Sequence, residues 1–132
     1  MPLVYISMLK GKSPEYVRAI ADRVHQTLVE TYGVPAADRF QFIRQYDRAD
    51  FIYDADYLGI HRTDDVVFIH IVAGNWRNLA TKQALYRRMA QRLAESPGLR
   101  PEDVQVIISS NARDEWSFGN GLASYVKEGD TT

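Results

Sequence analysis

The chain repeats the stretch Val4-Tyr5-Ile6-Ser7-Met8-Leu9-Lys10-Gly11 as Val67-Phe68-Ile69-His70-Ile71-Val72-Ala73-Gly74, at an offset of 63 residues. Two residues are then inserted, and the offset becomes 65. The pairs related by this second offset are Lys12 and Arg77, Gly33 and Gly98, and Asp38 and Asp103. Each half reads as an apolar strand, a glycine turn, an amphipathic helix and a second strand. This pattern predicts two βαβ units in tandem.

The helices of the two units carry start and stop signals. Ser13 and Pro14 suit the N-cap and the first position of a helix, and Gly33 with Pro35 predicts its end. Apolar residues recur on one face of this helix, at Val17, Ile20, Ala21, Val24 and Leu28. The second helix is expected from about Leu79 to Glu95, with Leu85, Met89 and Leu93 inward and Pro97-Gly98 closing it. Strands are expected to follow at about Arg39–Tyr46 and Val104–Ser110.

These elements predict an α/β (α+β) fold in a single domain, residues 1–132. The first βαβ repeat covers about 2–46, a linker 47–65, the second repeat about 66–111 and a C-terminal tail 112–132. Right-handed crossovers would place both helices on one face of a four-stranded mixed sheet. The strand beginning at Val66 is apolar on both faces, so we expect the uncovered face to pack against other copies in a symmetric homo-oligomer.

Composition limits the possible partners. The 132 residues are 45% hydrophobic and 25% charged, with a net charge of -1, which gives no electrostatic reason to expect nucleic acid or an anionic membrane. There is no cysteine, and no apolar stretch long enough to span a membrane, so we expect a soluble cytoplasmic protein. The three histidines show no ligand spacing, and no phosphate or dinucleotide loop is evident, so neither metal nor cofactor is expected.

The residue after Met1 is Pro2, which opens the first apolar strand. A small residue at this position usually permits removal of the initiator methionine, and removal would leave a secondary amine at the chain start. An α-amino group titrates at about 7.7–8.0, and burial lowers that value, so such a nitrogen can move protons near neutral pH. Many proteins begin Met-Pro for no chemical reason, however, and with Met1 retained the nitrogen is an amide that cannot shuttle protons.

A tandem βαβ chain that starts Met-Pro, with Gly11-Lys12-Ser13 before its first helix, resembles the tautomerase superfamily over nearly its whole length. The first half is similar to a 4-oxalocrotonate tautomerase subunit. Two further blocks resemble the malonate semialdehyde decarboxylase branch most closely. They are Gly33-Val34-Pro35-Ala36-Ala37-Asp38-Arg39-Phe40 and Trp116-Ser117-Phe118-Gly119-Asn120-Gly121.

The resemblance implies a homotrimer with Pro2 at the base of a small pocket. In the decarboxylase branch the proline stays protonated and cooperates with an aspartate, here Asp38, and with arginines that bind the substrate carboxylate. In the tautomerases the proline is neutral and acts as a general base. Where the branch has two arginines close together, this chain reads Gly74-Asn75-Trp76-Arg77, so Arg77 alone matches.

Each candidate residue also has a structural interpretation. Arg77 would grip a carboxylate, or be a solvated arginine at a helix start. Lys12, its repeat equivalent, suits the pocket or the surface equally. Asp38 would activate water or affect the protonation of Pro2, although its repeat partner Asp103 favours a turn or cap role for one or both. Trp116 and Phe118 would form the apolar wall of the pocket, or pack in an oligomer interface.

The remaining polar candidates are weaker. His70 alternates with buried strand residues and is expected to be a satisfied core histidine, while Arg39, Arg44 and His61 are expected to be surface charges. The leading hypothesis is a cofactor-independent tautomerase or hydratase-type enzyme acting on a small 2-oxo or unsaturated carboxylic acid. The alternatives are a malonate semialdehyde decarboxylase, and a non-catalytic oligomeric binding domain of ferredoxin-like appearance.

Overall fold

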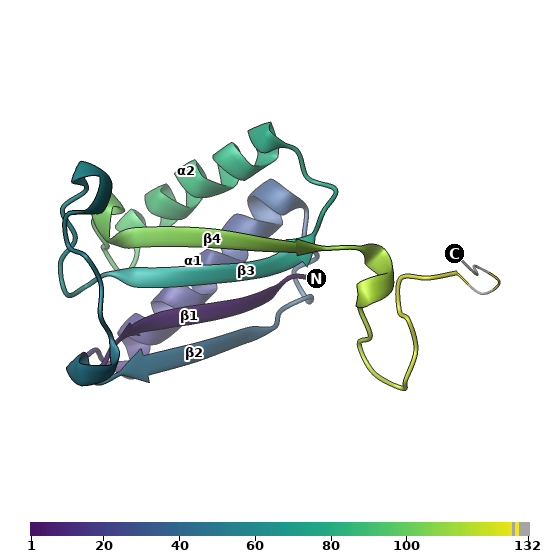
Figure 1. Ribbon diagram of the computed structural model, residues 1–132, viewed down its shortest axis with the longest axis horizontal. Coiled ribbons are helices and arrows are strands. Elements are labelled where there is room, and N and C mark those ends of the chain that lie inside the picture. The colour runs from purple at the N-terminus through teal and green to yellow at the C-terminus, as the bar shows by residue number, and fades with distance from the viewer. Residues whose placement is uncertain (128, 130–132) are drawn as a thin grey trace.

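A four-stranded sheet carries two helices on one face (Figure 1). The computed structural model describes residues 1–127 and 129. Its elements are β1 (Leu3–Leu9), α1 (Pro14–Tyr32), β2 (Gln41–Tyr46), β3 (Val67–Gly74), α2 (Leu79–Glu95) and β4 (Val104–Asn111). The strand order is β2-β1-β3-β4, with β1 parallel to β2, β3 parallel to β4, and β1 antiparallel to β3. The two βαβ units and the mixed sheet expected from the repeat are confirmed.

Local signals determine where the helices begin and end. The Ser13 hydroxyl accepts a hydrogen bond from the Tyr16 N–H at 3.1 Å and caps α1, and Gly33 ends that helix with a left-handed backbone, φ 68°. The Asn78 side chain caps α2 in the same way, accepting from the Thr81 N–H at 2.9 Å. The expected bounds of both helices are therefore confirmed.

The core lies between the sheet and the helices. Alternate residues of the strands point toward α1 and α2 because side chains of a strand alternate between its faces. Fully buried side chains of this core include Ile6, Ile20, Val24, Leu28, Ile69, Ile71, Leu85, Met89 and Leu93. The inward residues expected on α2 are all among them.

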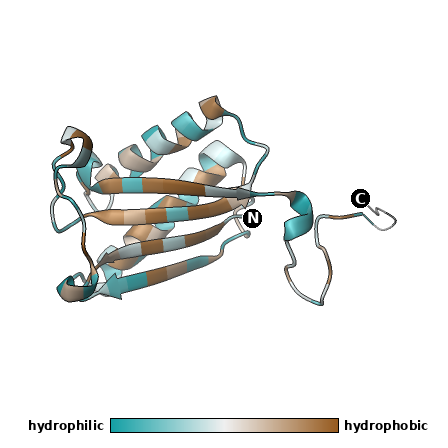
Figure 2. Cartoon of the chain, viewed as in Figure 1, coloured by the Kyte–Doolittle hydropathy of each residue, from teal (hydrophilic) through white to brown (hydrophobic). Residues whose placement is uncertain are grey.

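Among the described residues, no helix or strand covers the other face of the sheet, and apolar residues are frequent along the strands (Figures 1 and 2). Phe42 and Ile107 are 55% and 60% exposed there. Tyr5 stacks against both Phe42 and His70, with ring centres 5.6 and 5.8 Å apart. The expectation that His70 is a core histidine is therefore wrong, because its ring lies on the open face of the sheet. Its Nε2 lies 2.7 Å from the Ser109 hydroxyl.

The segment between the two units, the linker expected at residues 47–65, is a loop. It contains two short 3-10 turns, Arg48–Asp50 and Tyr57–Gly59. Two strands differ from expectation at their ends: β2 begins at Gln41, two residues later, and β4 extends one residue further to Asn111. Such differences are within the usual uncertainty of strand boundaries.

Introducing a charge on the open sheet face is expected to dissociate the assembly. Ile107→Asp places a carboxylate where we expect another copy to bury an apolar surface, and burying an unpaired charge is costly. Sedimentation velocity should show a smaller species than wild type. Leu79→Asp, at an exposed leucine on the helical side, is the matched control and should leave the mass unchanged. An Ile107→Asp protein of unchanged mass would exclude this face as the interface.

Candidate active site

The antiparallel pairing of β1 and β3 brings distant segments to one end of the sheet. Leu3 pairs with Val72, so the chain start lies beside the end of β3, from which the loop to Arg77 leaves. Because β4 runs parallel to β3, its last residue, Asn111, also lies there, opposite Gly74. Figure 1 shows the N-terminus, the ends of both strands and the start of the C-terminal segment together.

At the centre of this region lies the amino group of the chain. The Met1 amine forms an ion pair with the Asp38 carboxylate, and the Tyr125 hydroxyl lies 3.4 Å from the same nitrogen. Met1 and Pro2 are both buried, yet Met1 is not part of the hydrophobic core cluster. Asp38 is held by a turn in which its N–H donates to the Pro35 carbonyl at 2.9 Å. A titratable amine and a carboxylate are thus placed together at the chain start.

Arg77 supplies the positive charge of the site. Its Nη2 donates to the Tyr32 carbonyl at 3.2 Å, and its guanidinium lies 4.6 Å from the centre of the Tyr32 ring. Its Nη1 is buried and has no hydrogen-bond partner among the residues that the structure describes. Burial lowers the pKa of the Met1 amine from its ordinary value of 8.0, and the Arg77 guanidinium lowers it further. An unpaired, partly desolvated N–H beside this amine is suited to binding a carboxylate.

Aromatic side chains from the C-terminal segment line the same region. Trp116 and Phe118 stack face to face, 5.5 Å apart, and the Trp116 indole N–H donates to the Asn111 side chain at 2.7 Å. Phe118 also contacts Phe40, and its edge meets the ring of Tyr125 at 5.5 Å. The aromatic cluster therefore reaches the amine through Tyr125.

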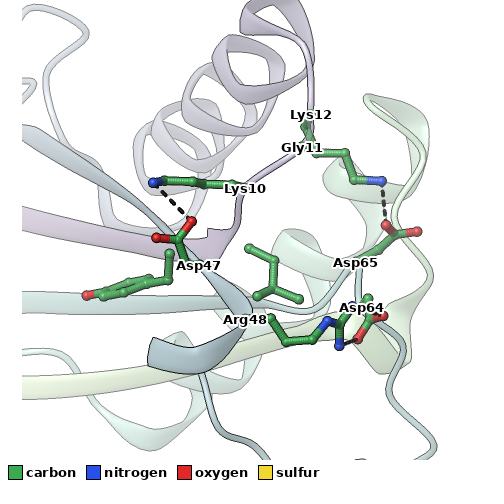
Figure 3. A pocket seen from close by; sticks show the side chains of 9 residues that line it. Lys10, Gly11, Lys12, Asp47, Arg48, Asp64 and Asp65 are labelled. Carbon is green, nitrogen blue, oxygen red and sulfur yellow. Dashed lines mark hydrogen bonds and ion pairs between the residues drawn. The ribbon is translucent and has the colours of Figure 1, made fainter.

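Lys12 lies at the opposite end of β1, in a different pocket of about 370 Å³ (Figure 3). Its ammonium group forms an ion pair with Asp65 at 2.5 Å. β1 spans seven residues, or roughly 20 Å, between Pro2 and Lys12. Within one chain, Lys12 is thus not brought together with the other candidates. The cause is the sheet topology. Lys12 follows β1 and Arg77 follows β3, and because these strands are antiparallel they end at opposite ends of the sheet.

Asp103, the equivalent of Asp38 in the second repeat, has a structural role. Asp103 is fully buried and accepts hydrogen bonds from the N–H and the hydroxyl of Thr63, both at 2.6 Å. It therefore ties the linker to the turn before β4. Asp38, its equivalent, faces the amine instead, so the two related carboxylates have different surroundings.

The weaker candidates are engaged elsewhere or lie on the sheet. Arg39 pairs with Asp22 at 2.8 Å, and His61 Nδ1 lies 2.5 Å from an Asp56 carboxylate oxygen. Arg44 pairs in register with Ser7, on the face opposite the helices. None of these three residues forms a hydrogen bond or ion pair with the Met1 amine.

Within residues 1–127 and 129, no group of three or more histidine, aspartate or glutamate side chains is arranged to hold a metal ion. No helix in the same residues combines the length and the apolar character needed to cross a membrane.

Sequence reasoning missed two residues of this region. Phe40 ends one of the quoted blocks but carries no distinguishing pattern of its own. Tyr125 lies in the tail, where a mixed sequence of small and polar residues shows no periodicity. Its contact with the amine depends on how the tail returns to the sheet, which no local pattern indicates.

Chemically, the arrangement can bind an anion and move a proton. Arg77 offers a guanidinium to a carboxylate, the amine offers a group whose pKa is lowered by burial and by Arg77, and Asp38 offers a second ionisable group. The aromatic cluster adjoins the amine through Tyr125. These parts suit acid–base chemistry on a small carboxylic acid.

Two family models match the chain, both described as tautomerase enzyme, over residues 38–119 and 2–60. The probable tautomerase YusQ of Bacillus subtilis (strain 168) is 39% identical over 127 residues, covering 96% of this chain and 100% of that protein.

Solved structures give the same result. FG41 malonate semialdehyde decarboxylase, inhibited by 3-bromopropiolate, is 40% identical with a TM-score of 0.87, covering 93% of each chain. Another malonate semialdehyde decarboxylase is 28% identical with a TM-score of 0.88, covering 93% of this chain and 95% of that one. A symmetric trimer of fused 4-OT shares the fold at 22% identity, with a TM-score of 0.74, over 91% and 94% of the two chains.

One family model spans more than half of the chain, and the relatives cover nearly all of it. Fold, family models and relatives agree on an enzyme close to the malonate semialdehyde decarboxylase branch. The chain belongs to the tautomerase family.

Proposed function

We propose that this enzyme uses the imino nitrogen of Pro2, after removal of Met1, to isomerise or hydrate a small 2-oxo or unsaturated carboxylic acid without a cofactor. The observation that carries the proposal is the buried amine at the chain start, between the Asp38 carboxylate and the Arg77 guanidinium. Membership of an enzyme family argues against the non-catalytic binding domain considered from the sequence.

Removal of Met1 would do two things at once. It would expose the Pro2 nitrogen as a secondary amine, and it would free the space that the buried methionine side chain occupies outside the core. The Met1 nitrogen, which would leave with the residue, contacts Asp38 and Tyr125, so a substrate placed there would lie beside the new amine. Burial and Arg77 lower an amine pKa at this site, which favours a neutral nitrogen able to accept a proton.

In the tautomerase reaction Pro2 would take the proton of an enol hydroxyl and return a proton to the adjacent carbon. Arg77 would hold the substrate carboxylate through its unpaired Nη1. Trp116 and Phe118 would form the apolar side of the pocket and keep bulk water from the reacting carbon. The result is a proton moved between oxygen and carbon at a fixed position.

The second candidate is the decarboxylase or hydratase reaction, which the two decarboxylase structures favour. One of these proteins is described with both decarboxylase and hydratase activities. In this variant Pro2 would stay protonated as a cationic acid, while Asp38 activates water or polarises the carbonyl. The ion pair at the amine is compatible with that protonated form.

The proposed assembly is a homotrimer. The exposed apolar face of the sheet requires a partner surface, and the fused 4-OT structure of the same fold is a trimer. We propose that three copies pack through these faces and that substrate enters between them.

Replacing Pro2 is expected to abolish the reaction. Pro2→Ala leaves a primary amine of different basicity and geometry, so the rate of ketonisation of phenylenolpyruvate should fall about 10²-fold or more. Pro14→Ala, at the first residue of α1, is the matched control and should retain the wild-type rate. Intact mass must show that one methionine is absent from wild type. An active protein that keeps Met1 contradicts the proposed use of Pro2.

Replacing Arg77 is expected to weaken substrate binding more than turnover. Arg77→Gln removes a charged hydrogen bond, so KM should rise about 10- to 100-fold with a smaller change in kcat. Arg87→Gln, on the exposed side of α2, removes the same charge outside the site and should change neither constant. Equal losses from the two variants would mean that Arg77 acts only through net charge.

The pH dependence separates the two candidate reactions. If neutral Pro2 is the base, ketonisation should increase as pH rises through the pKa of its nitrogen, which burial and Arg77 would lower as they lower the pKa of the Met1 amine. Asp38→Asn removes a neighbouring negative charge and should move the midpoint to lower pH, whereas Asp22→Asn on the surface should not. A rate that instead falls with rising pH would indicate a cationic Pro2, as in the decarboxylase reaction. Nitrogen NMR of Pro2 measures the same pKa directly.

A further inference from the structure

The loop after β3 is built around Trp76. The indole ring lies so close over Gly74 that a Cβ at this position would collide with its ring carbons. A glycine is therefore required at the end of β3 for Trp76 to adopt this position. The indole is still 40% exposed, so one part of it faces solvent.

Two guanidinium groups contact this indole. The Cζ of Arg77 lies 4.8 Å from the ring centre and the Cζ of Arg113 lies 4.1 Å from it. The two carbons are consequently at most about 9 Å apart. Arg77 follows β3, while Arg113 begins the 3-10 turn Arg113–Glu115 after β4. The parallel pairing of β3 with β4 brings both arginines to one edge of the sheet.

Neither arginine has a carboxylate partner among residues 1–127 and 129. Glu115, two residues after Arg113, accepts a hydrogen bond from the Ala112 N–H at 2.9 Å and none from Arg113. By contrast, Arg48 and Arg92 elsewhere on the surface bind one or two carboxylates each. Repulsion from Arg113 contributes to a lowered pKa of Arg77, behind the larger effect of burial. Two neighbouring positive charges without acidic partners favour a ligand that brings two negative charges.

We propose that Arg113 is a specificity-determining residue that selects substrates with two acidic groups, one bound by Arg77 and the other by Arg113. This inference rests on the proposed function, since it concerns the same carboxylate site. The loop Gly74-Asn75-Trp76-Arg77 carries a single arginine, and Arg113 places a second guanidinium beside it. Arg113 lies in the turn that follows β4.

The dimensions suit short dicarboxylates. In a bidentate pair the carboxylate carbon lies roughly 4 Å from the guanidinium carbon. With Cζ atoms no more than about 9 Å apart, a three- or four-carbon dicarboxylate can reach both arginines. Both guanidinium groups make cation–π contacts with Trp76, which stabilise their charges.

The test compares two inhibitors of equal chain length in the ketonisation of phenylenolpyruvate. Succinate has two carboxylates and butyrate has one. For wild type we expect succinate to inhibit at about tenfold lower concentration than butyrate. Arg113→Gln should remove most of this preference, because inhibition by succinate weakens while inhibition by butyrate stays within about twofold of wild type. Arg113→Lys should keep part of the preference, and Arg87→Gln should keep all of it.

Three outcomes would overturn the inference. The first is a wild-type protein that succinate and butyrate inhibit equally well. The second is an Arg113→Gln protein that keeps the preference for succinate. The third is an Arg113→Gln protein in which inhibition by both compounds weakens by the same factor. The last would mean that Arg113 only orients Trp76 and Arg77. If wild type shows no ketonisation, the proposed function fails separately, and calorimetric titration of the same proteins with succinate and butyrate still tests Arg113.

Discussion

The antiparallel pairing of β1 with β3 is the constraint on which the rest of this molecule depends. It joins two similar βαβ units so that the start of one lies beside the end of the other's central strand. The chain terminus is thereby placed next to the loop that carries Arg77, and next to the aromatic segment that follows β4. Without that pairing, the amine, the guanidinium and the aromatic cluster would belong to separate regions.

The same pairing makes the two ends of the sheet unequal. One end holds the amine with Asp38 and Arg77, and the other holds Lys12 with Asp65 and the buried Asp103. At the second end the charges neutralise each other in ion pairs (Figure 3). At the first end a guanidinium Nη1 stays without a partner among the described residues, and burial disfavours the charge on the amine. The two ends of the duplicated sheet therefore differ: one has paired charges, and the other has an unpaired guanidinium nitrogen beside a partly desolvated amine.

Features that depend on nearby residues could be predicted from the sequence, and features that depend on tertiary approach could not. The caps at Ser13 and Gly33 and the inward face of α2 follow from local spacing, so their positions were anticipated. The sequence repeat suggested that Lys12 and Arg77 lie at the same site. Comparing two sequence segments does not reveal that their strands run in opposite directions. Tyr125 and Arg113 reach the site from beyond β4, and no spacing along the chain reveals such a return.

The burial of Met1 has a consequence for the biosynthesis of the enzyme. Once the sheet has formed, this residue is only 5% exposed and its amine is engaged by Asp38. An aminopeptidase therefore has access mainly to the nascent or unfolded chain, and trimming competes with folding. If Pro2 acts as proposed, folded subunits that retain Met1 would accumulate as an inactive fraction whenever synthesis outpaces the peptidase. The specific activity of a preparation would then depend on how fast the protein was expressed.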